Sequence, residues 1–203
     1  PASEAAFWHP EHVAFDSKGD LYVCDNSNDR IRKIDMKTGI VSTVLGNGQR
    51  ASSGDGELAT EAAVLMPDAL CFDPDDNLYV TSEITDDVLR YNDTSGAFID
   101  VFATGNGLDV PFGEVFGPDG NLYVANRGSN NILRYNGTTG AYIDDYIPAG
   151  VIGAPGAMAF YPFEDAMMYV TDTENHQVLR FNPASPGAGE AFVTGAAEDI
   201  GGL

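Results

Sequence analysis

The stretch DGNLYVANRGSNNILRYN, residues 119–136, decides the fold of this chain because its pattern occurs four times. Each copy has an apolar residue followed by Tyr-Val, and an isoleucine or valine stands ten residues after that apolar residue. A basic side chain follows two positions later, and Asp or Asn closes the pattern. The other three copies lie at 18–35, 75–92 and 165–182. We call a position that recurs at the same place in each copy a column. Several columns with the same spacing in every copy indicate an internal structural repeat.

Each copy is preceded by a proline and, five residues after the proline, a phenylalanine. The prolines are Pro10, Pro67, Pro111 and Pro155. They are 57, 44 and 44 residues apart. We therefore predict a single domain over residues 1–203, built from four repeats. Their approximate bounds are 7–66, 67–110, 111–154 and 155–203.

Every repeat reads as four short strands. The first holds Val13 to Asp16, the Leu-Tyr-Val triplet forms the second, and turns such as 117–120 (Gly-Pro-Asp-Gly) supply the backbone angles that tight turns need. Thr-Gly pairs, as at 38–39, lead into the fourth strand. No stretch has sustained helical periodicity. Four strands in about 45 residues is the size of a propeller blade, so we predict an all-β fold, a β-propeller of four-stranded antiparallel blades.

The motifs of the first unit resemble an NHL repeat. They read Pro-x-x-x-x-Phe-Asp, Leu-Tyr-Val-x-Asp and Asn-x-Arg-Ile-Arg-Lys-Ile-Asp. The segments 43–46 (Thr-Val-Leu-Gly) and 53–56 (Ser-Gly-Asp-Gly) are similar to the bacterial form of the repeat. Residues 88–92 and 117–124, in units two and three, resemble the repeats of secreted bacterial NHL proteins. The resemblance implies a propeller that closes with six or seven blades. We therefore expect the four visible NHL-type repeats to be part of a larger or assembled propeller, with a closed four-blade ring as a further alternative.

An open run of four blades would leave apolar blade faces in water. We expect further blades, a second copy or another chain to cover the faces of the terminal blades. The segments 7–8 (Phe-Trp) and 192–193 (Phe-Val) mark these two ends of the chain.

The balance of charge excludes some partners. The chain has 31 acidic and 10 basic residues, a formal net charge of −21. Nucleic acids and anionic membrane surfaces are themselves negatively charged, so we expect neither as a partner. No apolar run approaches the roughly 18 residues that a membrane helix needs, so we expect no membrane insertion. Acidity together with the family resemblance favours an extracellular or cell-surface location, with the periplasm as an alternative.

The turns between strands two and three are predicted to lie on the same face as the connections between blades, which we call the loop face. Ligands bind preferentially where loops vary over a rigid scaffold. We therefore predict a binding site for a protein or a glycan on this face. Its candidate residues are Asp25, Asn28, Glu83, Asp86, Glu114, Asn126, Arg127, Asp172 and His176. The alternative is that Asx and Ser residues occur there because tight turns require them.

Glu114 departs from its column, which holds Val13, Leu70 and Met158 in the other units. A carboxylate thus replaces an apolar residue on an innermost strand. Two interpretations stay open. The side chain faces a water-filled central channel, or it is buried and marks a functional site.

The histidines are the residues most able to hold a metal ion, and all three lie on the predicted loop face. They are His9, His12 and His176. The resemblance includes a metal-dependent amidating lyase, but these histidines belong to units one and four. We therefore predict that they hold no transition metal together, and we expect no cofactor.

No catalytic motif of the Gly-x-Ser-x-Gly, His-Glu-x-x-His or P-loop type is present in the sequence. The function that we expect is a secreted or cell-surface recognition or scaffold module. The alternative is a metal-dependent lyase or hydrolase of the NHL or lactonase propeller type.

Two further columns are interpreted as structural. A basic residue recurs in every unit near the column of Asp25 and Asp172, and we predict that it forms ion pairs between blades. The four are Lys33, Arg90, Arg134 and Arg180. Cys24 and Cys71 lie in small-residue columns, which favours two buried thiols. A disulfide joining strand two of one blade to strand one of the next is the alternative.

Overall fold

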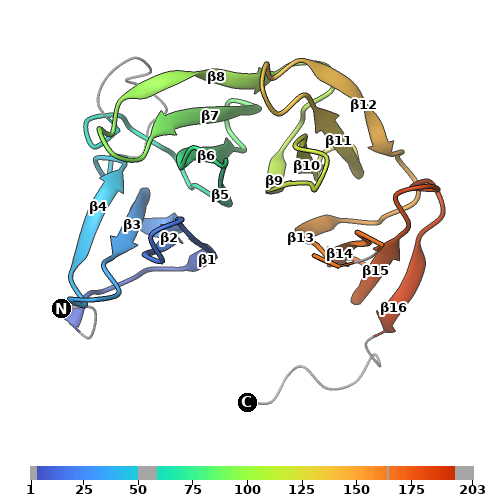
Figure 1. Ribbon diagram of the computed structural model, residues 1–203, viewed down its shortest axis with the longest axis horizontal. Helices are drawn as coiled ribbons and strands as arrows, with labels where there is room; N and C mark the ends of the chain where they lie inside the picture. The colour runs from blue at the N-terminus through green and yellow to red at the C-terminus, as the bar shows by residue number, and fades with distance from the viewer. Residues whose placement is uncertain (1–3, 50–58, 164, 195–203) are drawn as a thin grey trace. The chain divides into compact units, whose positions relative to one another are not determined.

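The computed structural model describes residues 4–49, 59–163 and 165–194, and its strands form four sheets, which we call blades (Figure 1). Blade 1 comprises β1 (Pro10–Phe15), β2 (Leu21–Asp25), β3 (Arg30–Ile34) and β4 (Val41–Leu45), with the 3₁₀ helix η2 (Asn26–Asn28). Blade 2 comprises β5 (Leu70–Phe72), β6 (Asn77–Ser82), β7 (Asp87–Asn92) and β8 (Phe98–Thr104). Blade 3 comprises β9 (Pro111–Phe116), β10 (Leu122–Asn126), β11 (Asn131–Tyr135) and β12 (Tyr142–Ile147). Blade 4 comprises β13 (Pro155–Phe160), β14 (Met168–Asp172), β15 (Gln177–Phe181) and β16 (Glu190–Thr194).

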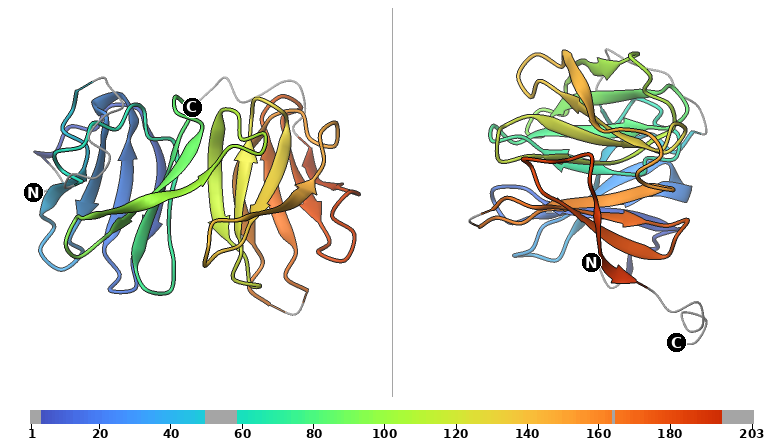
Figure 2. Two further views of the ribbon diagram at one scale, coloured as in Figure 1. Left: turned by 90° about the horizontal axis from the view of Figure 1, so that it is seen from above. Right: turned by 90° about the vertical axis from the view of Figure 1, so that its right-hand side faces the viewer.

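Each blade is an antiparallel meander in which consecutive strands are neighbours, and Figure 2 shows the blades from two further sides. The predicted four-stranded antiparallel blades, with the apolar–Tyr–Val triplets on strand two, are confirmed. The first strand of blade 1 was expected at Val13 to Asp16, but it begins at Pro10 and ends at Phe15. Proline is tolerated at the first residue of a strand, which explains the earlier start.

Successive residues of a strand point to opposite faces of a sheet, so each blade has two distinct apolar faces. We call the face that carries the triplet tyrosine the forward face and the other the rear face. In blade 1 the forward face carries Tyr22, Cys24 and Leu45, which are all buried. In blade 2 the rear face carries Leu70 and Val80, also buried.

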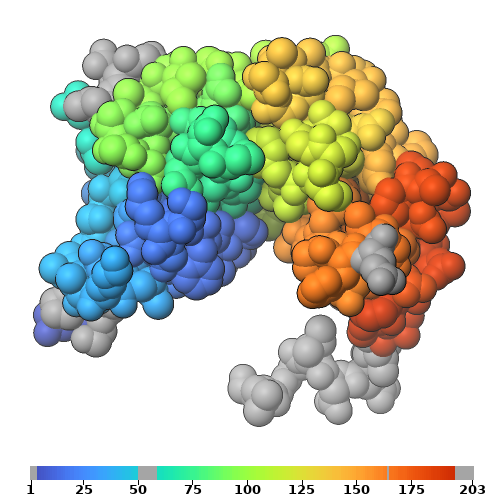
Figure 3. Space-filling view, in the orientation of Figure 1, coloured from blue at the N-terminus to red at the C-terminus, as the bar shows by residue number. Residues whose placement is uncertain are grey.

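The chain divides into two compact units, Pro1–Pro111 and Phe112–Leu203. In the first unit, the core joins forward-face residues of blade 1 to rear-face residues of blade 2, such as Leu70. In the second unit, the core joins Ile147 of blade 3 to Met158 of blade 4 in the same way. The space-filling view shows the close packing of the two blades within each unit (Figure 3). The predicted single domain over residues 1–203 stays a prediction.

An aromatic contact recurs in both units at the junction between blades. The ring of Tyr22 meets that of Phe72 edge to face, with centroids 4.8 Å apart. Tyr123 meets Phe160 in the same way at 5.0 Å. Such edge-to-face pairs add about 0.5–1.5 kcal/mol beyond the burial of their area. The repeated columns therefore build the same junction twice.

The prediction of ion pairs between blades is wrong for the basic column. Each arginine of this column pairs with an acid on strand four of its own blade, because the register places the two residues directly opposite each other. The pairs are Arg90 with Asp100, Arg134 with Asp144 and Arg180 with Glu190. In blade 1, Lys33 bonds to the turn residues Asp16 and Asp20. In blades 2 to 4 the column therefore fastens strand three to strand four, whereas in blade 1 it holds the turn after β1.

No disulfide joins Cys24 to Cys71, which agrees with the two-thiol interpretation. Cys24 is buried in the core of the first unit, and Cys71 is half-buried. No helix within the described ranges has the length and the apolar character that a bilayer span requires.

Candidate functional site

On the loop face of blade 1, hydrogen bonds to the backbone N–H and carbonyl groups of Trp8 fix its position. Its N–H donates to Asp25 Oδ1 at 2.8 Å, and its carbonyl accepts the N–H of Ser27 at 3.0 Å. Asn28 donates to the same carboxylate at 2.8 and 2.9 Å. Asp25 is fully buried, whereas Trp8 is 67% exposed. A tryptophan fixed on a rigid backbone and open to solvent is well suited to bind a partner.

Asp172 plays the same clamping role in blade 4. It is buried and accepts hydrogen bonds from the backbone N–H groups of Gly153 and Ala154, both at 3.2 Å. Asn175 and Gln177 add side-chain donors at 2.9 and 3.2 Å. Burial alone would raise the pKa of Asp172, but these hydrogen bonds lower it to about 2. The carboxylate is thus ionised, and its hydrogen bonds hold the turn after β14 and the segment that leads into β13.

The last residue of each turn between strands two and three has a left-handed backbone. The four residues are Asp29, Asp86, Asn130 and His176, with φ between 52° and 54°. Asn, Asp and His are the side chains most often tolerated there. Asp86 also accepts the N–H of Val110 at 2.8 Å, and Asp29 accepts that of Met66 at 3.0 Å. The backbone of the turn therefore accounts for the polar residues of this column.

The candidate residues of blade 3 also have contacts within the second unit. Asn126 is fully buried and donates to Asn131 Oδ1 at 2.8 Å. The guanidinium of Arg127 lies 3.4 Å from the centroid of the Phe112 ring, which is a cation–π contact. Glu83, in the first unit, is half-buried in the turn after β6.

Glu114 on β9 is 3% exposed, and neither carboxylate oxygen has a hydrogen-bond partner. The expectation that it faces a water-filled channel is therefore wrong. Burial raises the pKa of Glu114 well above the usual range. The carboxyl group therefore stays protonated at pH values at which an exposed glutamate is ionised. A neutral, unpartnered carboxyl group is a costly replacement for the apolar residues of its column.

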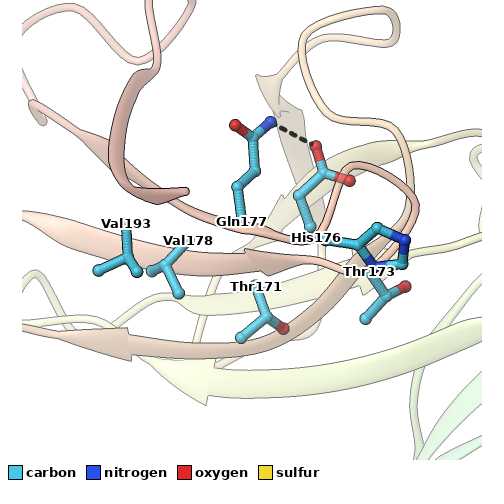
Figure 4. A pocket seen from close by; sticks show the side chains of 7 residues that line it. Thr171, Thr173, His176, Gln177, Val178 and Val193 are labelled. Atoms are coloured by element: carbon cyan, nitrogen blue, oxygen red, sulfur yellow. Dashed lines mark hydrogen bonds between the residues drawn. The ribbon is translucent and has the colours of Figure 1, made fainter. Parts of the chain in front are cut away.

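His176 lies at the rim of a hollow on the forward face of blade 4 (Figure 4). The hollow has a volume of about 340 Å³. Val178 and Val193 lie next to each other on its floor, Thr171 lies beyond Val178, and Gln177 donates a hydrogen bond to Asp172. The side chain of His176 is exposed.

The other histidines lie in the first unit. His9 is exposed and pairs with Glu11, with 2.7 Å between Nδ1 and Oε1. His12 is half-buried, and desolvation lowers its pKa. Among the residues in the three described ranges, no group of three or more His, Cys, Asp and Glu side chains could hold a metal ion.

The structure brings some of the predicted residues together. Asp25 joins Asn28 beneath Trp8, and Asp172 joins His176 around the hollow. Asp86, Asn126 and Arg127 instead contact Val110, Asn131 and Phe112. Trp8 was expected only as a marker of a blade end. Trp8 is 17 residues from Asp25 in the sequence, so its contact with the Asp25 carboxylate could not be read from the motifs.

Comparison with known proteins identifies one repeat of a described family in blade 1. Residues 7–34 match the family model described as NHL repeat. The protein SUPPRESSOR OF QUENCHING 1, chloroplastic, from Arabidopsis thaliana is 30% identical over 109 residues. The match covers 52% of this chain and 10% of that protein, so the chain spans a tenth of this relative's length.

Several solved structures are similar to the chain as a whole. Virginiamycin B lyase from Staphylococcus aureus has a TM-score of 0.63 at 17% identity, covering 90% of this chain and 55% of that one. A gluconolactonase from Xanthomonas campestris has a TM-score of 0.70 at 18% identity, covering 91% and 62%. A chain of a nidogen/laminin complex has a TM-score of 0.69 at 22% identity, covering 91% and 66%. At these identities the likeness concerns the fold alone, and it confirms the predicted β-propeller class.

Proposed function

We propose that this chain, an NHL-repeat β-propeller, is a recognition or scaffold module that binds a protein or a glycan through its loop face. The observation that carries the proposal is the exposed indole of Trp8 on its buried Asp25 clamp. As part of the same proposal, the module acts outside the cell or at its surface, the periplasm included.

The clamp supports binding because it removes the flexibility that an exposed side chain usually has. Two backbone hydrogen bonds fix the position of Trp8, and the buried Asp25 carboxylate is saturated by Asn28. A preorganised aromatic group loses little conformational entropy on binding. Tryptophan is also among the residues that most often dominate binding energy at protein interfaces.

The other polar loop residues support a scaffold role. Asp25 and Asp172 accept hydrogen bonds from backbone N–H groups of the segments that lead into strand one of their own blades, and Asp86 accepts one from the segment that leads into β9. A carboxylate that already holds its own backbone is poorly placed for general acid–base chemistry. These side chains therefore shape the loop face on which Trp8 stands.

A metal-dependent lyase or hydrolase is the second candidate, and the likeness to virginiamycin B lyase and a gluconolactonase favours it. One fold hosts unrelated functions, and a chain of a nidogen/laminin complex has the same fold. Elemental analysis of the purified chain separates the candidates. Stoichiometric zinc that is lost on His176→Ala would favour the enzyme.

The binding proposal is tested with a glycan array and a displayed protein-domain library, each probed with the purified chain. Every hit is then titrated in solution while the fluorescence of Trp8, the only tryptophan, is recorded. We expect a saturable change in fluorescence and a loss of affinity of about tenfold or more on Trp8→Ala.

The matched control is Phe163→Ala, which removes a similarly exposed aromatic ring, 66% accessible, from a turn of blade 4. This variant should bind like the unmodified chain. Ligands whose affinity falls equally in both variants, or hits that leave the fluorescence of Trp8 unchanged, would overturn the proposed role of the loop face.

A further inference from the structure

Two apolar faces, one in each unit, are open to solvent although their columns are buried elsewhere. On the rear face of blade 1, Val13 is 55% and Phe15 is 59% exposed. On the forward face of blade 4, Phe192 is 53% and Val193 is 52% exposed. One open face is thus of the rear type and the other of the forward type.

The same columns are buried wherever a second blade covers them. Leu70, in the column of Val13, is 0% exposed. Leu45 and Ile147 lie in the column of Val193, opposite the first apolar residue of strand three, and both are 0% exposed. Both internal junctions join a forward face to a rear face. The exposed rear face of blade 1 and the exposed forward face of blade 4 therefore carry the same kinds of apolar residues as the two faces that pack together inside each unit.

We propose that the rear face of blade 1 docks on the forward face of blade 4 of a second copy of this chain. The occupant of the hollow on blade 4 is then the β1 segment of that copy. This contact depends on the apolar side chains of β1 and β16, whereas the binding proposed above depends on the indole of Trp8.

The internal junctions specify the contacts of the docked pair. Val13 meets Val178 and Val193 on the floor of the hollow, as Leu70 meets the forward face of blade 1. Phe15 meets Tyr169 edge to face, as Phe72 meets Tyr22 at 4.8 Å. The junction between copies therefore repeats an arrangement that the chain already contains twice.

A backbone hydrogen bond completes the match. The residues that precede Pro67 and Pro111 have left-handed backbones, and their N–H groups donate to Asp29 and Asp86 of the preceding turn. His9, which precedes Pro10, has the same left-handed φ of 56°. Its N–H would donate to an imidazole nitrogen of His176 in the partner copy, since His176 occupies the column of Asp29.

Arg32 is the one departure on the rear face of blade 1, because the other blades have leucine in its column. Its guanidinium lies 3.8 Å from Asp25 of its own blade, and the side chain is 21% exposed. The charge is thus directed to a carboxylate within blade 1.

The contact is heterologous, because it uses different surfaces on the two copies, and this property supplies a sharp test. The mass of the unmodified chain and of two variants, Val13→Asp and Val193→Asp, is measured by sedimentation across micromolar concentrations. We expect the unmodified chain to exceed its monomer mass of 21.6 kDa and each variant alone to remain at that mass.

An equimolar mixture of the two variants should form a one-to-one complex. Val13→Asp retains an intact blade 4 face and Val193→Asp retains an intact blade 1 face, so one good junction forms between them. The controls Ile40→Asp and Phe163→Asp alter exposed apolar side chains in turns, 58% and 66% accessible, and should associate like the unmodified chain. Circular dichroism of each variant confirms that it is folded.

Three results would overturn the proposal. They are an unmodified chain that is monomeric at every concentration, a single variant that associates by itself, and a mixture of folded variants that stays monomeric. The second result would indicate a symmetric contact that uses one face on both copies. The third would show that the two faces do not recognise each other.

Discussion

The junction between blades 1 and 2 and the junction between blades 3 and 4 share their apolar columns but differ at their polar end. In the first unit, Lys33 donates to Asp16 and to Tyr22 Oη, both at 2.9 Å. Asp93 of blade 2 approaches Tyr22 Oη at 3.4 Å and closes this network.

In the second unit, Pro183 stands in the column of Asp93 and the network is open. Arg134 bonds to Asp144, and Tyr123 Oη donates to Asp119 at 2.9 Å. A cavity of about 120 Å³ remains, lined among others by Asp119, Tyr123, Arg134 and Pro183. Apolar columns therefore determine how two blades pack. The hydrogen-bond network at the polar end, which we call the polar closure, differs between the two junctions.

The largest effect is expected from removing an apolar residue of a junction. Leu70→Ala should lower the free energy of unfolding by about 2–5 kcal/mol, because it leaves a cavity in the buried core of the first unit. Val13→Ala, in the same column but exposed, should change it by less than about 0.5 kcal/mol. Denaturant titration measures both. Equal losses would show that the column has no common packing role.

Asp172→Asn should destabilise the second unit by about 2 kcal/mol at neutral pH. The folded pKa of about 2 lies below the ordinary value of 3.8, so the carboxylate stabilises the fold above pH 4. This contribution is lost as the pH falls from about 4 to about 2. The difference between unmodified chain and variant should therefore shrink in acid, and a constant difference from pH 7 to pH 2 would contradict the role of the charge.

Glu114→Met should stabilise the fold by about 1–3 kcal/mol at pH 7, because methionine is the residue of this column in blade 4. The folded pKa of Glu114 is raised, so folding takes up a proton and the penalty grows as the pH rises above the unfolded pKa. The gain measured by thermal unfolding should be smaller at pH 4 than at pH 7. A gain independent of pH would point to packing alone.

The smallest effect concerns the polar closure. Asp93→Asn should lower stability by about 0.5–1 kcal/mol, since it weakens a partly buried contact to Tyr22 and Lys18. The corresponding change in the second unit, Pro183→Asn, places a similar amide beside the 120 Å³ cavity and should change stability less. Chemical denaturation of both variants compares the junctions directly. A larger loss in the second unit would contradict the comparison.

The fold could be predicted from the sequence because the decisive information is periodic. The triplets on strand two and the prolines before strand one keep one register in all four blades. The partners of the basic column could not be predicted in this way. Asp100, Asp144 and Glu190 face their arginines through the register of strands three and four, and bulges in those strands shift the pairing.

The candidate site was less predictable because its residues have two reasons to be polar. Asp86 and His176 satisfy a left-handed backbone, and Asp172 satisfies buried N–H groups, whatever the function is. Burial of Glu114 depends on tertiary packing, which its column alone does not specify. Trp8 became interpretable only when its backbone contacts with Asp25 and Ser27 were known.

The central claim is that equivalent columns are packing surfaces, covered in β5 and β12 and open in β1 and β16. Amide hydrogen exchange at a low and a high protein concentration tests it most directly. The account predicts that β5 and β12 are protected equally at both concentrations, and that β1 and β16 gain protection only at the high one. Protection of β1 and β16 that does not depend on concentration, or rapid exchange throughout β5, would contradict it.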